Sequence, residues 1–165
     1  ARNVLDYHAR LLSPENMAWL KQMPYLHKHQ EGFTICHGSP IEPQEFNYVF
    51  FIEQAMQLLP KCAELDHITF IGHSHLTKAF ALTPTNATDI TANTLTFESD
   101  KKYFVTVGSV GQPRDYDNRA CCTIYDTDLK KLQYFRLPYN IEDTVKKLFA
   151  SEITYNFGKR LYLGI

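Results

Sequence analysis

Three short apolar runs, each followed by glycine or histidine, stand out in the hydrophobic pattern of the chain. They cover residues 33–36, 68–71 and 103–107 and are rich in aromatic and β-branched side chains. Such runs, when bounded by turn residues, are typical of buried strands. Since ligands bind beyond the carboxyl ends of strands in open α/β sheets, the pattern predicts a site where these three strands end.

The rest of the pattern predicts helices near both ends and short strands between them. Residues 1–12 indicate the end of a helix, and Ser13-Pro14 is typical of the start of another, with Trp19 as its core anchor. Helices are also expected over residues 45–59 and 141–149. Two antiparallel hairpins are expected, one from strands 78–82 and 94–97 and one from strands 120–126 and 132–137.

Two histidines, His73 and His75, follow the second run directly after Gly72. Residues two apart in an extended chain point to the same side, so both rings could lean over the end of the strand. Imidazole suits Zn, Mn, Fe or Ni, whereas Mg and Ca prefer oxygen ligands. A His-x-His pair alone is weak evidence for a metal site, and a turn whose histidines bond to backbone carbonyls is the alternative.

The first and third runs end in a similar way, which strengthens the metal hypothesis. The first leads into His37, Gly38 and Pro40, and the third leads into a glycine-rich loop that contains Arg114. Histidines from two strand ends could therefore meet at one site. Arg114 could pair there with an anion or form only a surface salt bridge.

Other potential ligands are expected to be structural. His27 and His29 precede the first strand and are expected on a solvated surface, in an edge strand or a loop. Adjacent Cys121 and Cys122 in a strand point to opposite faces, which favours packed, reduced thiols over disulfides. Asp66 precedes the second strand, so it is expected at the end opposite His73.

The loops that follow the three runs resemble those of the calcineurin-like metallophosphoesterases. The motifs are His37-Gly-Ser-Pro40, Gly72-His-Ser-His75 and Gly108-Ser-Val-Gly-Gln-Pro-Arg114, in this order. The small bacterial phosphodiesterase and diadenosine-tetraphosphatase-like branch is the most similar, along nearly the whole chain. The resemblance implies an α/β/β/α sandwich and two divalent metal ions, with Mn, Zn, Fe and Ni as candidates. It also implies that His37 and His73 ligate one ion, that His75 ligates the other, and that Arg114 contacts the substrate.

The resemblance covers only the later motifs of that family. Its early motifs, Asp-x-His, Gly-Asp-x-x-x-Asp and Gly-Asn-His-Asp or Glu, do not occur in the sequence. The family takes its bridging aspartate, further ligands and its acid-like histidine from them, so no catalytic acid or base is assigned here. Residues 1–165 are therefore expected to be the C-terminal portion of a single α/β metallophosphoesterase domain, with the N-terminal βαβ motifs absent.

Composition and charge exclude several other classes. The 165 residues, 44% hydrophobic and 21% charged, are typical of one globular domain. A formal net charge of −1 gives no electrostatic footprint for nucleic acid or an anionic membrane. No apolar run approaches the roughly 20 residues of a membrane helix, and no secretory signal opens the chain. A cytoplasmic location is expected.

Two functions from different classes are compatible with these features. The first is a metal-dependent hydrolase of phosphomonoesters, phosphodiesters or nucleotides, which would use hydroxide held by a dinuclear site. This chain alone is expected to be inactive or impaired, because imidazoles cannot bridge two cations and balance their charge. The second is a non-catalytic interaction module with the same fold. A serine hydrolase is not favoured, because Val107 stands where the Gly-x-Ser-x-Gly motif needs its first glycine.

The resemblance also predicts association with other polypeptide. The early motifs would supply strands beside those that end at His37 and His73. Without them, these strands are expected to show unpaired edges and bare apolar faces. The chain is therefore expected to form a homo-oligomer or to associate with a complementary N-terminal segment.

Overall fold

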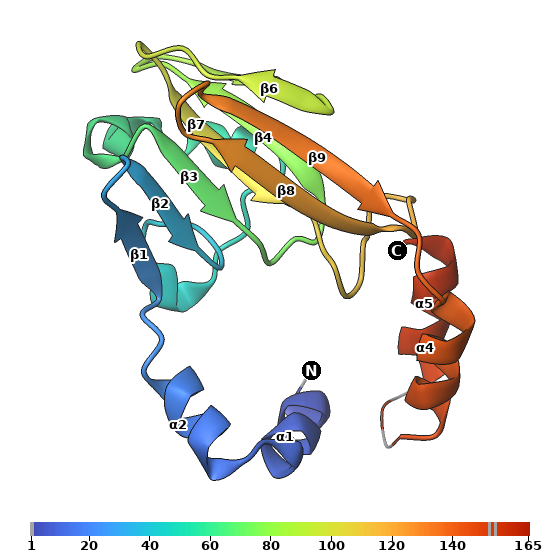
Figure 1. Ribbon diagram of the computed structural model, residues 1–165. Helices are drawn as coiled ribbons and strands as arrows, with labels where there is room; N and C mark the ends of the chain where they lie inside the picture. Colours follow the sequence, from blue (N-terminus) through green and yellow to red (C-terminus); the bar gives the residue numbers. More distant parts are fainter. Residues whose placement is uncertain (1, 152, 154) are drawn as a thin grey trace.

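The computed structural model describes residues 2–151, 153 and 155–165, which form two β-sheets with helices near both ends of the chain (Figure 1). The larger sheet contains β1 (Leu26–His29), β2 (Phe33–Cys36), β3 (Ile68–Ile71), β4 (Thr77–Leu82), β5 (Ala87–Asp89) and β7 (Lys102–Val107). The smaller sheet contains β6 (Thr94–Thr96), β8 (Ala120–Asp126) and β9 (Lys131–Leu137). The strand orders are β1-β2-β3-β7-β4-β5 and β6-β9-β8. The expected α/β fold class is confirmed.

The three apolar runs of the sequence form the neighbouring strands β2, β3 and β7. These strands are parallel, with Phe33 paired to Ile68 and Ile68 paired to Tyr103. Their carboxyl ends therefore lie at one edge of the larger sheet, as the pattern predicted. The loops after Cys36, Ile71 and Val107 all start from this edge.

Two hydrophobic cores cover the two faces of the larger sheet. One contains Ile71 and Phe104 and packs against α3 (Ile52–Met56) and the 3₁₀ helix η2 (Leu59–Glu64). The other contains Ile68 and Val105 and lies between the two sheets. All four residues of β3 are buried, because each face of this strand is covered.

The expected open edges at β2 and β3 are wrong. Strand β2 lies between β1 and β3, and β3 lies between β2 and β7, so the described chain pairs both of them on each side. The smaller sheet instead ends at β8, which has a described partner on one side only. The smaller sheet covers part of the larger one, and at β2 the contact runs from Phe33 to Tyr125 of β8, with ring centroids 5.9 Å apart.

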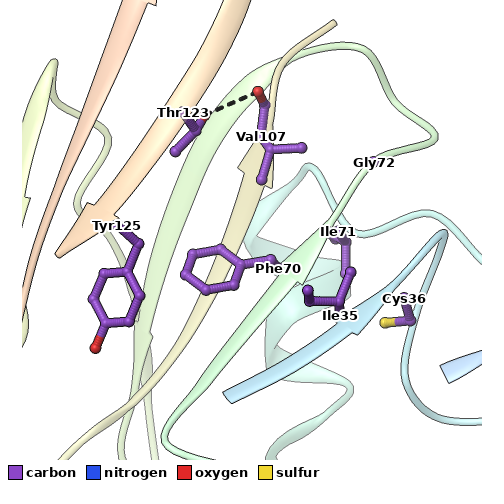
Figure 2. Close-up of a pocket in the computed structure, with 8 residues that line it drawn as sticks. All are labelled: Ile35, Cys36, Phe70, Ile71, Gly72, Val107, Thr123 and Tyr125. Carbon is purple, nitrogen blue, oxygen red and sulfur yellow. Dashed lines mark hydrogen bonds between the residues drawn. The ribbon is translucent and has the colours of Figure 1, made fainter. Parts of the chain in front are cut away.

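An apolar cavity of about 220 Å³ lies between β8 and the strands β2, β3 and β7. Figure 2 shows the rings of Phe70 and Tyr125 side by side, with Ile35 at the side of β2, and their centroids are 5.4 Å apart. Thr123 Oγ1 donates a 3.0 Å hydrogen bond to the Val107 carbonyl and joins the two sheets here. Ile35, on the β2 side of this cavity, keeps 47% of its surface exposed.

The two N-terminal helices, α1 (Arg2–Leu11) and α2 (Pro14–Lys21), lie away from the sheets (Figure 1). The predicted start of α2 is confirmed, because Ser13 Oγ accepts a 3.2 Å hydrogen bond from the Asn16 backbone N–H. The prediction of Trp19 as a core anchor is wrong. Its side chain is 59% exposed, since α2 has no buried residue among those described.

The helix predicted over residues 45–59 is confirmed only for its middle, α3. The chain forms a short 3₁₀ helix, η1 (Pro43–Glu45), then an irregular segment, and only then α3. Phe46 has φ of 52°, a left-handed conformation that no α-helix contains. The Gln54 side chain accepts hydrogen bonds from the N–H groups of Phe50 and Phe51. These bonds cap the start of α3, which begins at Ile52.

One predicted hairpin is confirmed and the other is wrong. Strands β8 and β9 pair antiparallel as expected. The segments 78–82 and 94–97 do not pair, because β4 joins β5 and β7 in the larger sheet while β6 joins β9 in the smaller one. The predicted terminal helix is α4 (Ile141–Phe149), and it packs against α5 (Tyr155–Leu163), which the pattern did not predict. Among the described residues, no helix is long and apolar enough to cross a membrane.

Candidate metal centre

Two of the predicted ligands lie in direct contact at the carboxyl edge of the larger sheet. His37 follows β2 and His73 follows β3 by one residue, and these strands are neighbours. The Nε2 atom of His37 lies 3.0 Å from the Nδ1 atom of His73. The Gly72 N–H also donates a 3.0 Å hydrogen bond to the His37 carbonyl, which fixes the two strand ends relative to each other.

The backbone at His73 and His75 is left-handed rather than extended, so the geometry assumed from the sequence is wrong. Their φ angles are 59° and 62°. Side chains other than glycine rarely adopt this conformation, and where they do the strain is often found at functional sites. Ser74, between the two histidines, is buried and its N–H donates to the Gly72 carbonyl at 2.6 Å. The chain therefore makes a tight turn that presents both imidazoles.

His75 is held from the opposite side of the turn by the loop after β7. Its Nδ1 atom lies 2.7 Å from the Gln112 carbonyl oxygen, so this nitrogen carries the proton in that bond. The Arg114 N–H donates to the His75 carbonyl, and the Arg114 guanidinium donates to the Gln112 side chain. The bond from His75 to a backbone carbonyl agrees with the alternative interpretation of the His-x-His pair as a structural turn. It uses only Nδ1, however, so the Nε2 atom of His75 does not take part in this bond.

Burial and neighbouring cations favour the neutral form of the two turn histidines. The pKa of His73 is lowered mainly by burial, and further by His37, His75 and Arg114. Burial also lowers the pKa of His75, against the opposing effect of the bond to Gln112. Neutral imidazole is the form that binds a metal, so these shifts reduce the competition from protons.

Aromatic side chains surround the imidazole pair, and the sequence pattern did not predict them there. Tyr48 stacks on His73, with ring centroids 4.0 Å apart and planes 19° apart. Phe46 meets His37 edge to face, with a centroid distance of 5.6 Å. Both aromatic residues belong to the segment that was expected to be helical. The signal that could have placed them is the glycine directly after His37.

Gly38 allows that aromatic segment to approach the site. A Cβ atom at position 38 would lie 2.9 Å from the backbone of Phe46 and of Asn47, closer than such contacts allow. The Ser39 N–H donates a 2.8 Å hydrogen bond to the Asn47 carbonyl and closes the loop. The buried Cys36 thiol donates to the Gly38 carbonyl, and burial raises the pKa of this thiol to about 12.

The loop that carries Gln112 and Arg114 is anchored to the smaller sheet. Gly108 has φ of 76°, and a Cβ atom there would lie 2.5 Å from Cys121 Sγ. Asp115 pairs with the largely buried Arg136 of β9 and accepts a 2.9 Å hydrogen bond from Thr77. These contacts fix the loop that bonds to His75.

The imidazole pair fits part of a metal site. Two nitrogens bound to one Zn²⁺ at about 2.0–2.1 Å lie roughly 2.9–3.4 Å apart, and the observed distance is 3.0 Å. The described residues contain no group of three or more His, Cys, Asp or Glu side chains with the geometry of a metal site. The pair is therefore a compatible but incomplete donor set, and the ligand roles of His37, His73 and His75 stay predictions.

Among the described residues, the other potential ligands make no contact with the imidazole pair that defines this site. His27 and His29 belong to the edge strand β1, as expected, and His27 lines a hollow that His37 also lines. Asp66 precedes β3 and accepts a hydrogen bond from Thr34. Cys121 is buried while its neighbour Cys122 is half-buried, and both are free thiols.

Comparisons with known proteins include a structural relative of stated class. No protein-family model matches the chain. The crystal structure of a metallophosphoesterase from Sphaerobacter thermophilus superimposes with a TM-score of 0.81 and 26% sequence identity, covering 94% of this chain and 64% of that one. The chain has a metallophosphoesterase-like fold. This fold agrees with the resemblance of the three sequence motifs to those of the metallophosphoesterases. It has two sheets, and its histidines lie at the strand ends.

Two further relatives match this chain over nearly its whole length. An uncharacterized protein of Methanocaldococcus jannaschii is 26% identical over 160 residues, covering 94% of this chain and 62% of the relative. A hypothetical protein from Pyrococcus horikoshii shares the fold, with a TM-score of 0.66 and 14% identity, covering 92% of this chain and 55% of that one. The chain thus spans less than two thirds of the length of each of these relatives. Divalent metal use is the general expectation for the metallophosphoesterase-like fold.

Proposed function

We propose that this chain carries part of the active site of a metal-dependent phosphoester hydrolase. The observation that carries the proposal is the 3.0 Å contact between His37 and His73 at adjacent parallel strand ends. The metallophosphoesterase neighbour and the order of the three motifs support it. The substrate class is phosphomonoesters, phosphodiesters or nucleotides.

In this proposal, His37 and His73 hold one divalent ion and His75 contributes to a second. Bound divalent ions supply a hydroxide nucleophile near neutral pH and neutralise charge on the phosphoryl group. The Gln112 carbonyl fixes the Nδ1–H tautomer of His75 and so directs Nε2 away from that bond. The Arg114 guanidinium, which the Gln112 side chain orients, is the proposed phosphate contact.

The test is hydrolysis of bis-p-nitrophenyl phosphate with Mn²⁺ by the chain alone and by its His73→Ala variant. The imidazoles are too few to hold and bridge two cations, so the chain alone is expected to show little or no turnover. Robust turnover that is lost in the variant would support the hydrolase but contradict the expected impairment. Turnover that survives the variant would contradict the assigned role of His73.

Metal analysis separates this proposal from a non-catalytic interaction module. The hydrolase requires that the chain binds a divalent ion through the imidazole pair, so His73→Ala and His37→Ala must both weaken Zn²⁺ binding. A module with the same fold has no such requirement. Absence of Zn²⁺ binding by the unaltered chain would favour the module.

We also propose that additional polypeptide completes the site by pairing with β8. Strand β8 has a described partner on one side only, and its Thr123 and Tyr125 line the apolar cavity together with Ile35 and Phe70. An added strand there would extend the smaller sheet over this cavity. Exposed apolar side chains on the N-terminal helices, Trp19 among them, provide further surface for association. The relatives are longer than this chain and so contain polypeptide that could fill this role.

Sedimentation tests this association. We expect the chain alone to form dimers or larger species, and we expect Ile35→Asp to weaken them, because a charge would enter the covered face. Leu129→Asp is a matched control, since Leu129 is 67% exposed in the turn between β8 and β9. A monomer at all concentrations would contradict the proposal.

A further inference from the structure

A hollow of about 690 Å³ opens beside the imidazole pair, and its walls are aromatic and aliphatic. Its volume lies within the roughly 300–1,000 Å³ typical of small-molecule sites. His37 lines the hollow together with Phe46 and Tyr25. Leu20 and Met23, from the end of α2 and the turn after it, add an apolar rim.

The aromatic rings of this hollow lie next to the His37 imidazole and to each other. The centroid of Phe46 is 5.6 Å from that of His37 and 5.8 Å from that of Tyr25. Phe46 is 39% exposed and Tyr25 is 58% exposed, so both present ring surface to solvent. The described residues that line the hollow include two imidazoles, His27 and His37, and no Lys, Arg, Asp or Glu, so the hollow offers ring surfaces that suit a planar group.

The backbone of Phe46 is held in place by the loop that follows His37. Gly38 permits the close approach of the Phe46 backbone, and the bond from Ser39 to Asn47 closes the loop. Phe46 itself adopts φ of 52°, a conformation unfavourable for an aromatic residue. Residues with such a strained backbone are often found at active sites and ligand-binding sites. The ring is therefore preorganised for a ligand.

We propose that this hollow binds the planar aromatic ring of the substrate, as in the base of a nucleotide, while the phosphate lies at His37 and His73. The inference rests on the proposed hydrolase function and narrows its substrates to phosphoesters that carry an aromatic ring. Stacking of a base on an aromatic side chain is tolerant of sequence and contributes to affinity at nucleotide sites. Phe46 and Tyr25 form the stacking surface.

The test compares the binding of 5′-AMP, adenosine and ribose 5-phosphate by NMR, with and without Zn²⁺. We expect AMP to bind roughly tenfold tighter than ribose 5-phosphate, and adenosine at up to about 5 mM to shift the ring protons of Phe46 and Tyr25 without metal. Phe46→Ala and Tyr25→Ala should each remove most of this preference. Phe46→Tyr should retain it, because it keeps the ring.

A matched control is Phe51→Ala. Phe51 is 59% exposed and belongs to the same segment, but it does not line the hollow. This variant should bind all three probes as the unaltered chain does. Equal loss in Phe51→Ala and Phe46→Ala would overturn the inference.

Three further outcomes would overturn the inference without touching the hydrolase proposal. These are equal binding of AMP and ribose 5-phosphate, no shift with adenosine at about 5 mM, and ring shifts that depend only on protein concentration. The last would mean that a second copy of the chain occupies the hollow. Failure of the hydrolase proposal looks different, because adenosine would still bind through Phe46 while metal binding and turnover were absent.

Discussion

The chain contains two His-x-His pairs, and the structure places them in opposite settings. His27 and His29 lie in the antiparallel edge strand β1, where His29 stacks on Phe33 at a centroid distance of 4.4 Å. His73 and His75 lie in a turn after the central strand β3. The spacing is identical, but the backbone is extended in the first pair and left-handed in the second.

The comparison shows that the residues on the neighbouring strand, and not the His-x-His spacing, decide whether such a pair can take part in a metal site. The neighbouring parallel strand delivers His37 to within 3.0 Å of His73. The neighbour of β1 runs antiparallel, so the residues opposite His27 and His29 are Ile35 and Phe33, neither of which can bind a metal. Parallel strands bring their ends to one edge, and this brings together ligands that are distant in sequence.

The largest expected effect comes from removing one member of the central pair. In His73→Ala, we expect the affinity for Zn²⁺ to fall by about 100-fold, or roughly 2.7 kcal/mol, because one of the two contacting nitrogens is lost. Isothermal titration calorimetry measures this. His29→Ala is the matched control and should change the affinity less than about twofold. Similar losses in both variants would mean that the two pairs bind metal alike.

A smaller effect is expected from the loop that contacts only the second pair. In Gly108→Ala, the new Cβ would lie 2.5 Å from Cys121 Sγ in a backbone with φ of 76°, so we expect a loss of about 2 kcal/mol in the free energy of unfolding. Urea unfolding measures it. Gly111→Ala has nothing within 4 Å of its new Cβ and should change stability by less than about 0.5 kcal/mol. Equal stability of the two variants would show that the close approach at Gly108 is not rigid.

The smallest expected effect is a pH dependence of stability that belongs to the second pair. Burial lowers the pKa of His73, so below its ordinary value of about 6.5 the unfolded chain takes up a proton before the folded chain does. The free energy of unfolding should therefore fall as the pH is lowered through this window, in metal-free buffer. Urea midpoints measure this effect. His73→Ala should flatten the dependence, whereas an unchanged slope in that variant would assign it to other groups.

Local patterns predicted the strands well because their apolar runs are continuous and bounded by turn residues. The strands β2, β3 and β7, and the confirmed hairpin of β8 and β9, are of this kind. The same reasoning failed at the start of the helix predicted over residues 45–59, where Phe46, Val49 and Phe50 have helical spacing. Val49 is buried as a helix core residue would be, but tertiary contact through Gly38 forces Phe46 into the left-handed region.

The sequence identified candidate residues for the site, whose ligand roles stay predictions, but not the geometry around them. Strand ends identified His37, His73 and His75 as candidates. The left-handed turn and the stacking of Tyr48 depend on contacts between segments far apart in the sequence. The carbonyl that holds His75 belongs to Gln112, and any residue type could supply a carbonyl, so the sequence contains no signal for it.

The buried thiol of Cys36 affects which reagents and cations can react at this edge of the sheet. Only a thiolate is a good nucleophile or a strong ligand for soft cations, and a pKa of about 12 keeps Cys36 protonated near neutrality. Alkylating agents and peroxide should therefore react slowly with it, although its neighbour in sequence is the exposed His37. Copper(I), which favours sulfur, gains no anionic ligand from Cys36, so coordination at this edge stays with nitrogen and oxygen donors.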